Sequence, residues 1–241
     1  MVLQCNDKNE IKEFYDGGTL LGVGKTAEVY LKDEKAFKVY RDCKTKRRLF
    51  EEIDMKYHLN CLSEIKVKNI WTPNNIYAIK SDVEMIDLDW VKGKNLRDET
   101  PDVSMSLFLD YLNELVENGT KLGEHRVLAR DFFNCNAIVN QSGINIIDTD
   151  EYNIMTFDET SCIEHNLNLF VSTILDSFFE TQGYFTFESK HLNSLYRKVY
   201  ADAVDYKDYL IFYYALCEEF GENESIKNLK SLIKTLGEVK K

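Results

Sequence analysis

The spacing of apolar residues changes once along the chain, close to residue 90, and this change restricts the possible folds. Before it, short apolar runs bounded by turn residues are typical of strands, and the stretch 44–60 is typical of a helix with one buried face. The strand-like runs are Thr19–Leu21, Glu28–Leu31, Ala36–Tyr40, 65–71, 74–80 and 83–91. After Gly93 the spacing becomes helical. The sequence therefore predicts an α+β protein, with an antiparallel sheet and one helix preceding a mostly helical part.

The second part of the chain combines helices with one short hairpin. An amphipathic helix is expected over 104–118, with Ser104 as N-cap and Gly119 just past its end. Two short apolar segments, Ala137–Asn140 and Ile144–Asp148, are joined by a turn that contains glycine, which is the pattern of a β-hairpin. Further helices are expected over 166–180, 209–220 and 225–239.

Length and composition suit one domain with a sizeable core. The chain has 241 residues, of which 44% are hydrophobic, and we expect a single domain over 1–241 with lobes 1–90 and 91–241. A net charge of −11 argues against a nucleic-acid partner, which requires clustered Lys and Arg. No apolar run approaches the length of a membrane span, and the charged N-terminus does not resemble a signal peptide. We expect a cytoplasmic monomer, with export by a signal-less route left open.

The segment Gly22-Val23-Gly24 lies between two predicted strands. Glycines in such a turn let the backbone approach a phosphate chain closely, although an ordinary hairpin turn has the same appearance. The neighbouring Gly24-Lys25-Thr26 invites comparison with the P-loop of NTPases. That motif needs a glycine five positions before Gly24, where this chain has Thr19, and it precedes a helix rather than a strand. A P-loop is therefore not expected.

Lys38 lies inside an apolar strand, where an ammonium group must pair with a carboxylate or reach solvent. One interpretation is a lysine on the solvent face of the strand. The other is a cation for the phosphates of a nucleotide, held by a carboxylate of the following helix. Glu52 is the candidate for that carboxylate, with Glu51 as the alternative.

The most specific pattern in the chain is Asp131, followed five residues later by Asn136, then the hairpin, then Asp148. Phosphoryl transfer needs a carboxylate that orients the attacking hydroxyl and oxygen ligands for Mg²⁺. Asp131 suits the first task, and Asn136 and Asp148 suit the second.

In this order and at these spacings, the motifs resemble the signature set of the protein-kinase-like superfamily over about residues 17–180. The resemblance implies ATP and Mg²⁺ as cofactors, with Asp131, Lys38 and Glu52 as catalytic residues and Asn136 and Asp148 as metal ligands. It also implies that Val29 and Ala36 enclose the adenine and that backbone groups at 89–91 bond its edge. The nucleotide-binding residues implied in this way are Gly22, Val23, Gly24, Val29, Ala36, Lys38, Leu88, Asp89 and Val91.

Several positions depart from that family. Ala129 replaces the histidine before the catalytic arginine–aspartate pair, and Phe133 replaces the catalytic-loop lysine. The metal-binding triplet is Asp148-Thr149-Asp150, and no Ala-Pro-Glu follows it. Either Asn166 or Asn168 stands where the family has an aspartate in the next long helix. The reaction class is still expected, because the metal ligands and Lys38 remain.

Three functions agree with this pattern. The first is a minimal Ser/Thr protein kinase, whose acceptor is a protein. The second is a small-molecule phosphotransferase of the aminoglycoside or choline kinase type, whose acceptor is a small hydroxylated molecule. The third is a pseudokinase that binds nucleotide or a partner without transfer. The short interval between Gly93 and Asp131 leaves no room for an inserted small-molecule pocket, which favours the protein kinase.

Overall fold

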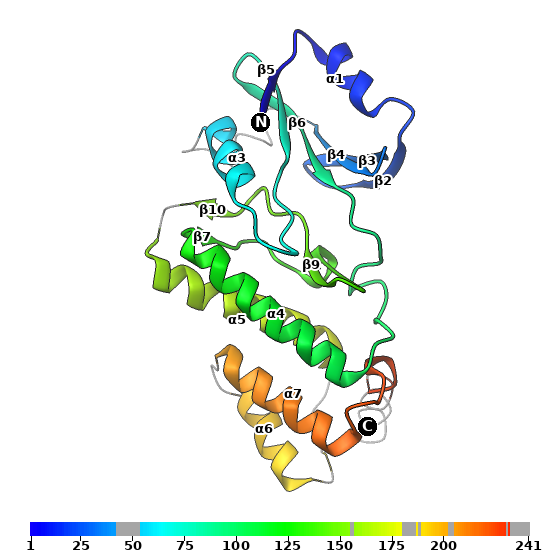
Figure 1. Ribbon diagram of the computed structural model, residues 1–241, viewed down its shortest axis with the longest axis vertical. Helices are drawn as coiled ribbons and strands as arrows, with labels where there is room; N and C mark the ends of the chain where they lie inside the picture. The colour runs from blue at the N-terminus through cyan, green and yellow to red at the C-terminus, as the bar shows by residue number, and fades with distance from the viewer. Residues whose placement is uncertain are drawn as a thin grey trace.

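A six-stranded sheet forms the first lobe of the protein, at the top of Figure 1, in the order β1-β5-β6-β4-β3-β2. The computed structural model describes residues 1–41, 54–154, 157–179, 187, 189–201, 205–229 and 231. The strands are β1 Val2–Gln4, β2 Thr19–Val23, β3 Ala27–Lys32, β4 Lys35–Tyr40, β5 Asn75–Ile79 and β6 Asp82–Asp89, and the helices of this lobe are α1 Lys8–Tyr15 and α3 Met55–Glu64.

Two features of this lobe differ from expectation. The sheet is antiparallel except at β1, which pairs in parallel with β5. The predicted strand over 65–71 is wrong: this segment leaves the sheet and reaches the second lobe. There Ile70 forms a bridge with Ile146, and the Trp71 amide donates to the Ile146 carbonyl at 2.9 Å. Its apolar side chains are buried between the lobes rather than on one face of the sheet, which explains the misleading pattern.

The second lobe is mostly helical, as predicted (Figure 1). Its elements are α4 Met105–Glu124, β7 Val127–Leu128, a 3₁₀ turn Asn134–Asn136, β8 Ala137–Asn140, β9 Gly143–Ile146, β10 Asn153–Ile154, α5 Glu159–Phe179, α6 Lys190–Ala201 and α7 Tyr206–Phe220. The hairpin of β8 and β9 is confirmed, and α5 begins earlier than expected. Two helices were predicted over 44–60 and 225–239, and the greater part of each lies outside the described residues.

Helix α4 begins at the predicted cap but does not end at Gly119. The Ser104 hydroxyl accepts from the Leu107 amide at 3.2 Å, as an N-cap does. A Cβ atom added at Gly119 would lie 2.9 Å from the Leu167 side chain, and one at Gly123 would lie 2.7 Å from the Ile163 backbone. Both glycines therefore permit close packing of α4 on α5 rather than ending the helix.

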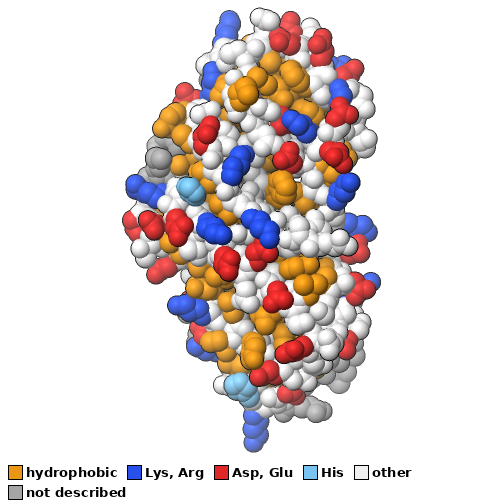
Figure 2. Space-filling view, viewed as in Figure 1, with side chains coloured by type: hydrophobic (Ala, Val, Ile, Leu, Met, Phe, Trp, Pro, Cys, Tyr) orange, Lys and Arg blue, Asp and Glu red, His pale blue; other side chains and the backbone are white. Residues whose placement is uncertain are grey.

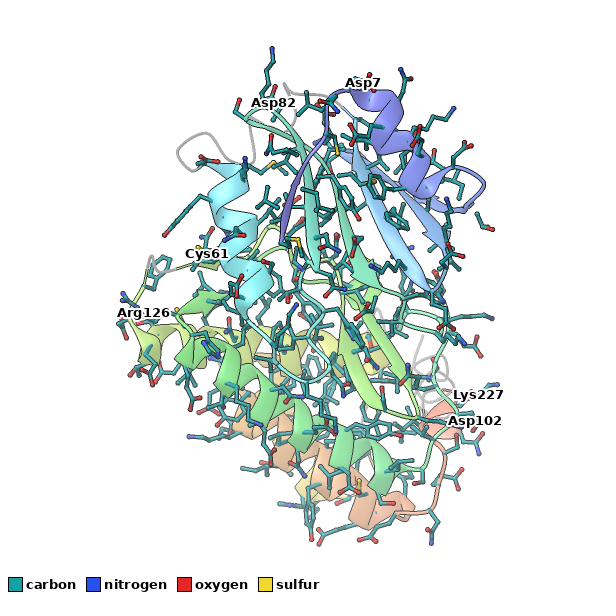
Figure 3. All side chains as sticks on the ribbon, turned by 45° about the horizontal axis from the view of Figure 1, so that its top comes forward. Asp7, Cys61, Asp82, Asp102, Arg126 and Lys227 are labelled. Atoms are coloured by element: carbon teal, nitrogen blue, oxygen red, sulfur yellow. The ribbon has the colours of Figure 1, made fainter. Side chains whose placement is uncertain are left out.

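The N-terminus of α4 is also held by the segment that follows α7. The Met105 amide donates to the Glu224 carbonyl at 2.8 Å, and the Ser106 amide donates to the Glu222 carbonyl at 3.0 Å. These bonds satisfy amides that a helix leaves unpaired at its start. Figure 3 shows the result: Asp102 and Lys227, far apart in sequence, lie side by side.

The two faces of β4 are buried in different clusters because successive side chains of a strand point to opposite sides. Phe37 packs with Tyr77 and Met85 in a small cluster beneath α1. Tyr40 belongs to the main core, which continues into the helical lobe. The face that carries Lys38 and Tyr40 is therefore directed toward the second lobe.

The visible face of the molecule carries Lys, Arg, Asp and Glu side chains interspersed over both lobes (Figure 2). Among the described helices, none is both long enough and apolar enough to cross a membrane.

Candidate active site

A cavity of 230 Å³ lies between the sheet and the hairpin of the second lobe. Its residues come from β3, β4, the end of β6, and both sides of the β8–β9 hairpin. The lining residues are Val29, Ala36, Lys38, Trp71, Leu88, Asp89, Trp90, Val91, Asn136, Ile138, Ile147, Asp148 and Asp150. Eight of the residues selected from the sequence are among them: Val29, Ala36, Lys38, Leu88, Asp89, Val91, Asn136 and Asp148.

Strand register explains how the first lobe builds its part of the cavity. Val29 of β3 is paired with Lys38 of β4, and Ala36 of β4 is paired with Leu88 of β6. Paired residues of neighbouring strands point to the same face of a sheet. The apolar side chains and the lysine ammonium therefore face the cavity together.

Lys38 is buried and forms ion pairs with two carboxylates. Its Nζ lies 2.5 Å from Asp148 Oδ1 and 2.8 Å from Asp150 Oδ1. Burial by itself lowers the pKa of the Lys38 ammonium, but the charges of Asp150 and Asp148 outweigh this effect and hold the pKa well above its ordinary value. The lysine is therefore a fixed cation in the cavity.

Asp150 is the more deeply buried of the two carboxylates. Its Oδ2 accepts a hydrogen bond of 2.6 Å from the Tyr40 hydroxyl. Burial raises the pKa of Asp150, but the Lys38 charge and the bonds from Lys38 and Tyr40 exceed that effect, so its pKa lies below the ordinary value. Asp150 is therefore ionised in the interior and compensates the charge of Lys38.

The segment carrying these aspartates is anchored by the residue between them. Thr149 is buried, and its hydroxyl donates to the Trp71 carbonyl at 2.8 Å. The backbone of Asp148 has a φ of +63°, which aspartate adopts more readily than most residues. Thr149 thus points inward while both carboxylates reach Lys38.

The loop that carries Asp131 is fixed from below by α5. Asn166 accepts from the Ala129 amide and donates to the Val127 carbonyl, both at 2.8 Å. Phe132 is buried against Phe170, with ring centroids 4.9 Å apart. These groups hold the loop on both sides of Asp131. The Asp131 side chain is exposed, and its backbone has a φ of +52°.

The Asn136 amide links the loop to the cavity. Its Nδ2 donates to the Asp131 carbonyl at 3.1 Å, and Asn136 itself lines the cavity with Asp148. An amide oxygen and a carboxylate are ligands that suit Mg²⁺, which keeps several waters and phosphate oxygens in addition. Within the described ranges, no group of three or more His, Cys, Asp or Glu side chains is arranged to hold a metal ion. The residues whose oxygens would suit such an ion are Asn136 and Asp148.

The cavity volume of 230 Å³ lies below the roughly 300–1,000 Å³ typical of small-molecule pockets.

The predicted glycine-rich loop does not line this cavity. Gly22 and Val23 belong to the exposed strand β2, and Gly24 lies in the turn to β3. None of the three is among the residues that line the cavity. Strand, turn and strand follow one another here, so the segment is not a P-loop. Glu51 and Glu52 lie outside the described residues.

Sequence reasoning missed the contribution of Asp150 and Tyr40. The available signal was the spacing of two residues in both segments, Lys38 to Tyr40 and Asp148 to Asp150. On β4 this spacing places the Lys38 and Tyr40 side chains on one face. The choice between Asn166 and Asn168 was also open, and the hydrogen bonds to the loop identify Asn166.

No protein-family model and no curated protein sequence matches the chain. Among solved structures, it is similar to a point mutant of the kinase domain of PknI from Mycobacterium tuberculosis, with a TM-score of 0.51 and 16% identity. The match covers 86% of this chain and 96% of that one. At this identity the similarity concerns the fold alone. The chain therefore has the bilobal protein-kinase-like fold.

Proposed function

We propose that the protein transfers the γ-phosphoryl group of ATP, bound with Mg²⁺, to the hydroxyl of a serine or threonine side chain in a protein. The observation that most supports this function is the convergence of Lys38, Asn136 and Asp148 on one cavity. Lys38 and Asp148 are separated by 110 positions in the sequence. Their convergence beside apolar residues gives a nucleotide both of its requirements, a surface for the base and charges for the phosphates.

In this proposal the apolar side chains of Val29, Ala36 and Leu88 enclose the adenine, and backbone groups at 89–91 bond its edge. The Lys38 ammonium binds the phosphates, and Asn136 and Asp148 provide the oxygen ligands for Mg²⁺. When bound, the ion neutralises the charge of the transferred phosphoryl group.

Asp131 is the proposed general base. Its loop is fixed by Asn166 and its carboxylate is exposed, so it can orient an incoming hydroxyl and accept its proton. The side chain of Phe133 is also 55% exposed. An open surface at this point suits a segment of a protein, whereas a small molecule requires an enclosing pocket.

The test is incubation with magnesium and γ-labelled ATP, against a protein extract and a panel of small hydroxylated molecules. Label on Ser or Thr of a protein is the expected result. Label on small molecules alone would contradict the acceptor class. If neither is labelled although ATP binds, phosphoryl transfer is excluded and the binding function of a pseudokinase remains.

The matched variants are Asp131→Ala and Asp82→Ala. Loss of a general base lowers the rate by about 10²–10⁴-fold. Asp131→Ala is therefore expected to lower the transfer rate at least about 100-fold. Its melting temperature should fall only slightly, because the side chain is exposed but alanine adopts a φ of +52° less readily than aspartate. Asp82 is exposed at the far end of the sheet lobe, as Figure 3 shows, and its variant should keep full activity. Equal rates for the two variants would refute the role of Asp131.

A further inference from the structure

A single carboxylate receives two donors from one strand. Lys38 and Tyr40 are two residues apart on β4 and point to the same face. The Lys38 ammonium donates to Asp150 Oδ1 at 2.8 Å, and the Tyr40 hydroxyl donates to Asp150 Oδ2 at 2.6 Å. Both oxygens of Asp150 are thus engaged, and its orientation relative to β4 is fixed by two contacts.

The two carboxylates described beside Lys38 differ in their access to solvent. The side chain of Asp148 is 48% exposed, whereas that of Asp150 is 3% exposed. A ligand that enters the cavity can therefore draw Asp148 away from the lysine. Asp150 has no comparable access, and a buried ammonium that loses all its partners is strongly destabilised. Asp150 is accordingly the partner that can stay with Lys38 when a ligand is bound.

The backbone on both sides of Asp150 is held in place. Thr149 is bonded to the Trp71 carbonyl, and the Tyr152 amide donates to the Thr149 carbonyl at 3.1 Å. Immediately after this turn, Asn153 and Ile154 form β10, which pairs with β7. The carboxylate is therefore carried by a fixed turn and not by a free loop.

We propose that Asp150 is the positioning residue for Lys38, in place of the carboxylate that the family resemblance assigns to Glu52. This inference rests on the proposed function, because it describes how the phosphate-binding cation of that site is held. Asp150, which accepts a hydrogen bond from Tyr40, would orient the lysine. It lies in the same turn as Asp148, the proposed metal ligand. Orientation of Lys38 would then be independent of a helix carboxylate.

The first experiment measures ATP affinity by calorimetry in the presence of magnesium. Asp150→Asn keeps the size of the side chain and removes its charge. A hydrogen bond to a charged group contributes roughly 1.5–3 kcal/mol, so we expect affinity to fall about 10-fold to 100-fold. Tyr40→Phe leaves the carboxylate in place and should weaken binding by a smaller factor. It also provides a measurement if Asp150→Asn does not fold.

The mechanism of the effect is tested in a Lys38→Met background. If Asp150 acts through the lysine, adding Asp150→Asn to Lys38→Met should change ATP affinity by less than about 2-fold, because the interaction is already lost. A purely structural role would give the same loss in both backgrounds, together with a lower melting temperature. Such additivity would overturn the inference.

The control for the alternative partner is the double variant Glu51→Gln/Glu52→Gln. It removes both glutamates that the sequence suggests as partners of Lys38, and we expect it to bind ATP within about 3-fold of the unaltered protein, a change of less than about 1 kcal/mol. A large loss in this variant with little change in Asp150→Asn would overturn the inference and restore the helix glutamate as the partner.

A third measurement does not depend on nucleotide and separates this inference from the proposed function. Acetylation of Lys38 by an amine-reactive ester is followed by mass spectrometry in the absence of ATP. In the unaltered protein the buried ammonium, paired with two carboxylates, should be acetylated slowly. The acetylation rate should be several-fold higher in Asp150→Asn and unchanged in the glutamate double variant. If these rates hold while no phosphoryl transfer occurs, the function is wrong and the positioning role stands. Equal rates in all three proteins would refute the positioning role alone.

Discussion

At the scale of single residues, the site depends on polar side chains that hold backbone groups. Asn166 is fully buried and forms two hydrogen bonds of 2.8 Å, one to the Ala129 amide and one to the Val127 carbonyl. An asparagine suits this place because its amide both donates and accepts. Since these bonds lie directly before Asp131, the position of the proposed base depends on a helix that is distant from it in sequence.

Removal of this amide is expected to destabilise the protein. Asn166→Ala leaves a buried donor and a buried acceptor unpaired, and each loss amounts to about 1–3 kcal/mol. We therefore expect the free energy of unfolding in urea to fall by about 2–6 kcal/mol. Asn166→Asp keeps the acceptor for Ala129 but loses the donor, so it should be affected less. Equal stability of Asn166→Ala and the unaltered protein would contradict this account.

At the scale of elements, the packing of α4 on α5 depends on two glycines with different surroundings. A Cβ atom at Gly119 would meet the end of the Leu167 side chain, which can move. At Gly123 it would meet Ile163 at 2.5 Å from Cγ1 and at 2.7 Å from the backbone nitrogen and Cα. The backbone cannot move without shifting the helix.

Alanine substitutions at these two positions should therefore differ. Alanine favours a helix by about 1 kcal/mol relative to glycine, whereas overpacking a core is destabilising by about 1–3 kcal/mol. Gly119→Ala should change the free energy of unfolding by less than about 1 kcal/mol, and Gly123→Ala should lower it by about 1–3 kcal/mol. Chemical denaturation of both variants checks this difference. The reverse order would show that α4 and α5 are not packed at Gly123.

A buried thiol on α7 makes this element sensitive to alkali. Burial, with a smaller contribution from Glu222, raises the pKa of Cys217 to about 11 from its ordinary value of 9.0. A thiol whose pKa is raised by folding stabilises the protein fully below the unfolded pKa, and this stabilisation is lost as pH rises from about 9 to about 11. The loss can reach about 1.4 kcal/mol per pH unit.

We therefore expect the stability of the unaltered protein to fall more steeply between about pH 9 and about pH 10.5 than that of Cys217→Ala. Urea denaturation at several pH values measures both slopes. The variant is less stable at neutral pH because it loses buried volume, so the comparison is of slopes and not of absolute values. Parallel slopes would indicate that the thiol titrates normally.

At the scale of the whole molecule, the lobes are joined by the segment after α3. Besides its backbone bond to Ile146, Trp71 donates through its indole Nε1 to Asn145 Oδ1 at 3.0 Å and accepts from Thr149. Asn145 is fully buried and donates to the Ile138 and Gly143 carbonyls. The sheet lobe and the hairpin beneath it thus share one hydrogen-bonded and apolar interface.

This interface predicts cooperative unfolding of the two lobes. Both tryptophans, Trp71 and Trp90, line the cavity between them, so tryptophan fluorescence reports on the interface. Far-UV circular dichroism is dominated by the helices of the second lobe. We expect the two signals to give the same midpoint in urea, which is the behaviour of a single cooperative unit. Separate midpoints would show that the lobes unfold independently.

The sequence by itself predicted the strands β2 to β6, the helices α4, α5 and α7, the hairpin, and the residues around the cavity at Lys38, Asn136 and Asp148. These features follow from spacing within short segments, because strand and helix periods and turn residues act locally. The sequence did not predict β1 or α6. The strand predicted over 65–71 was wrong, because burial alone does not reveal whether a segment packs in a sheet or between two lobes. Gly119 was misread for a similar reason, since its role depends on a helix that lies much further along the chain.

The partner of Lys38 shows where local reasoning ends. A lysine in an apolar strand must pair with a carboxylate or reach solvent, and this requirement follows from charge and burial that the sequence already indicates. Which carboxylate fulfils it depends on the distance between segments that are far apart in the chain. Only the tertiary structure decided that Asp150 meets Lys38 and Tyr40, because side-chain contacts between β4 and the turn after β9 are fixed by the packing of the two lobes.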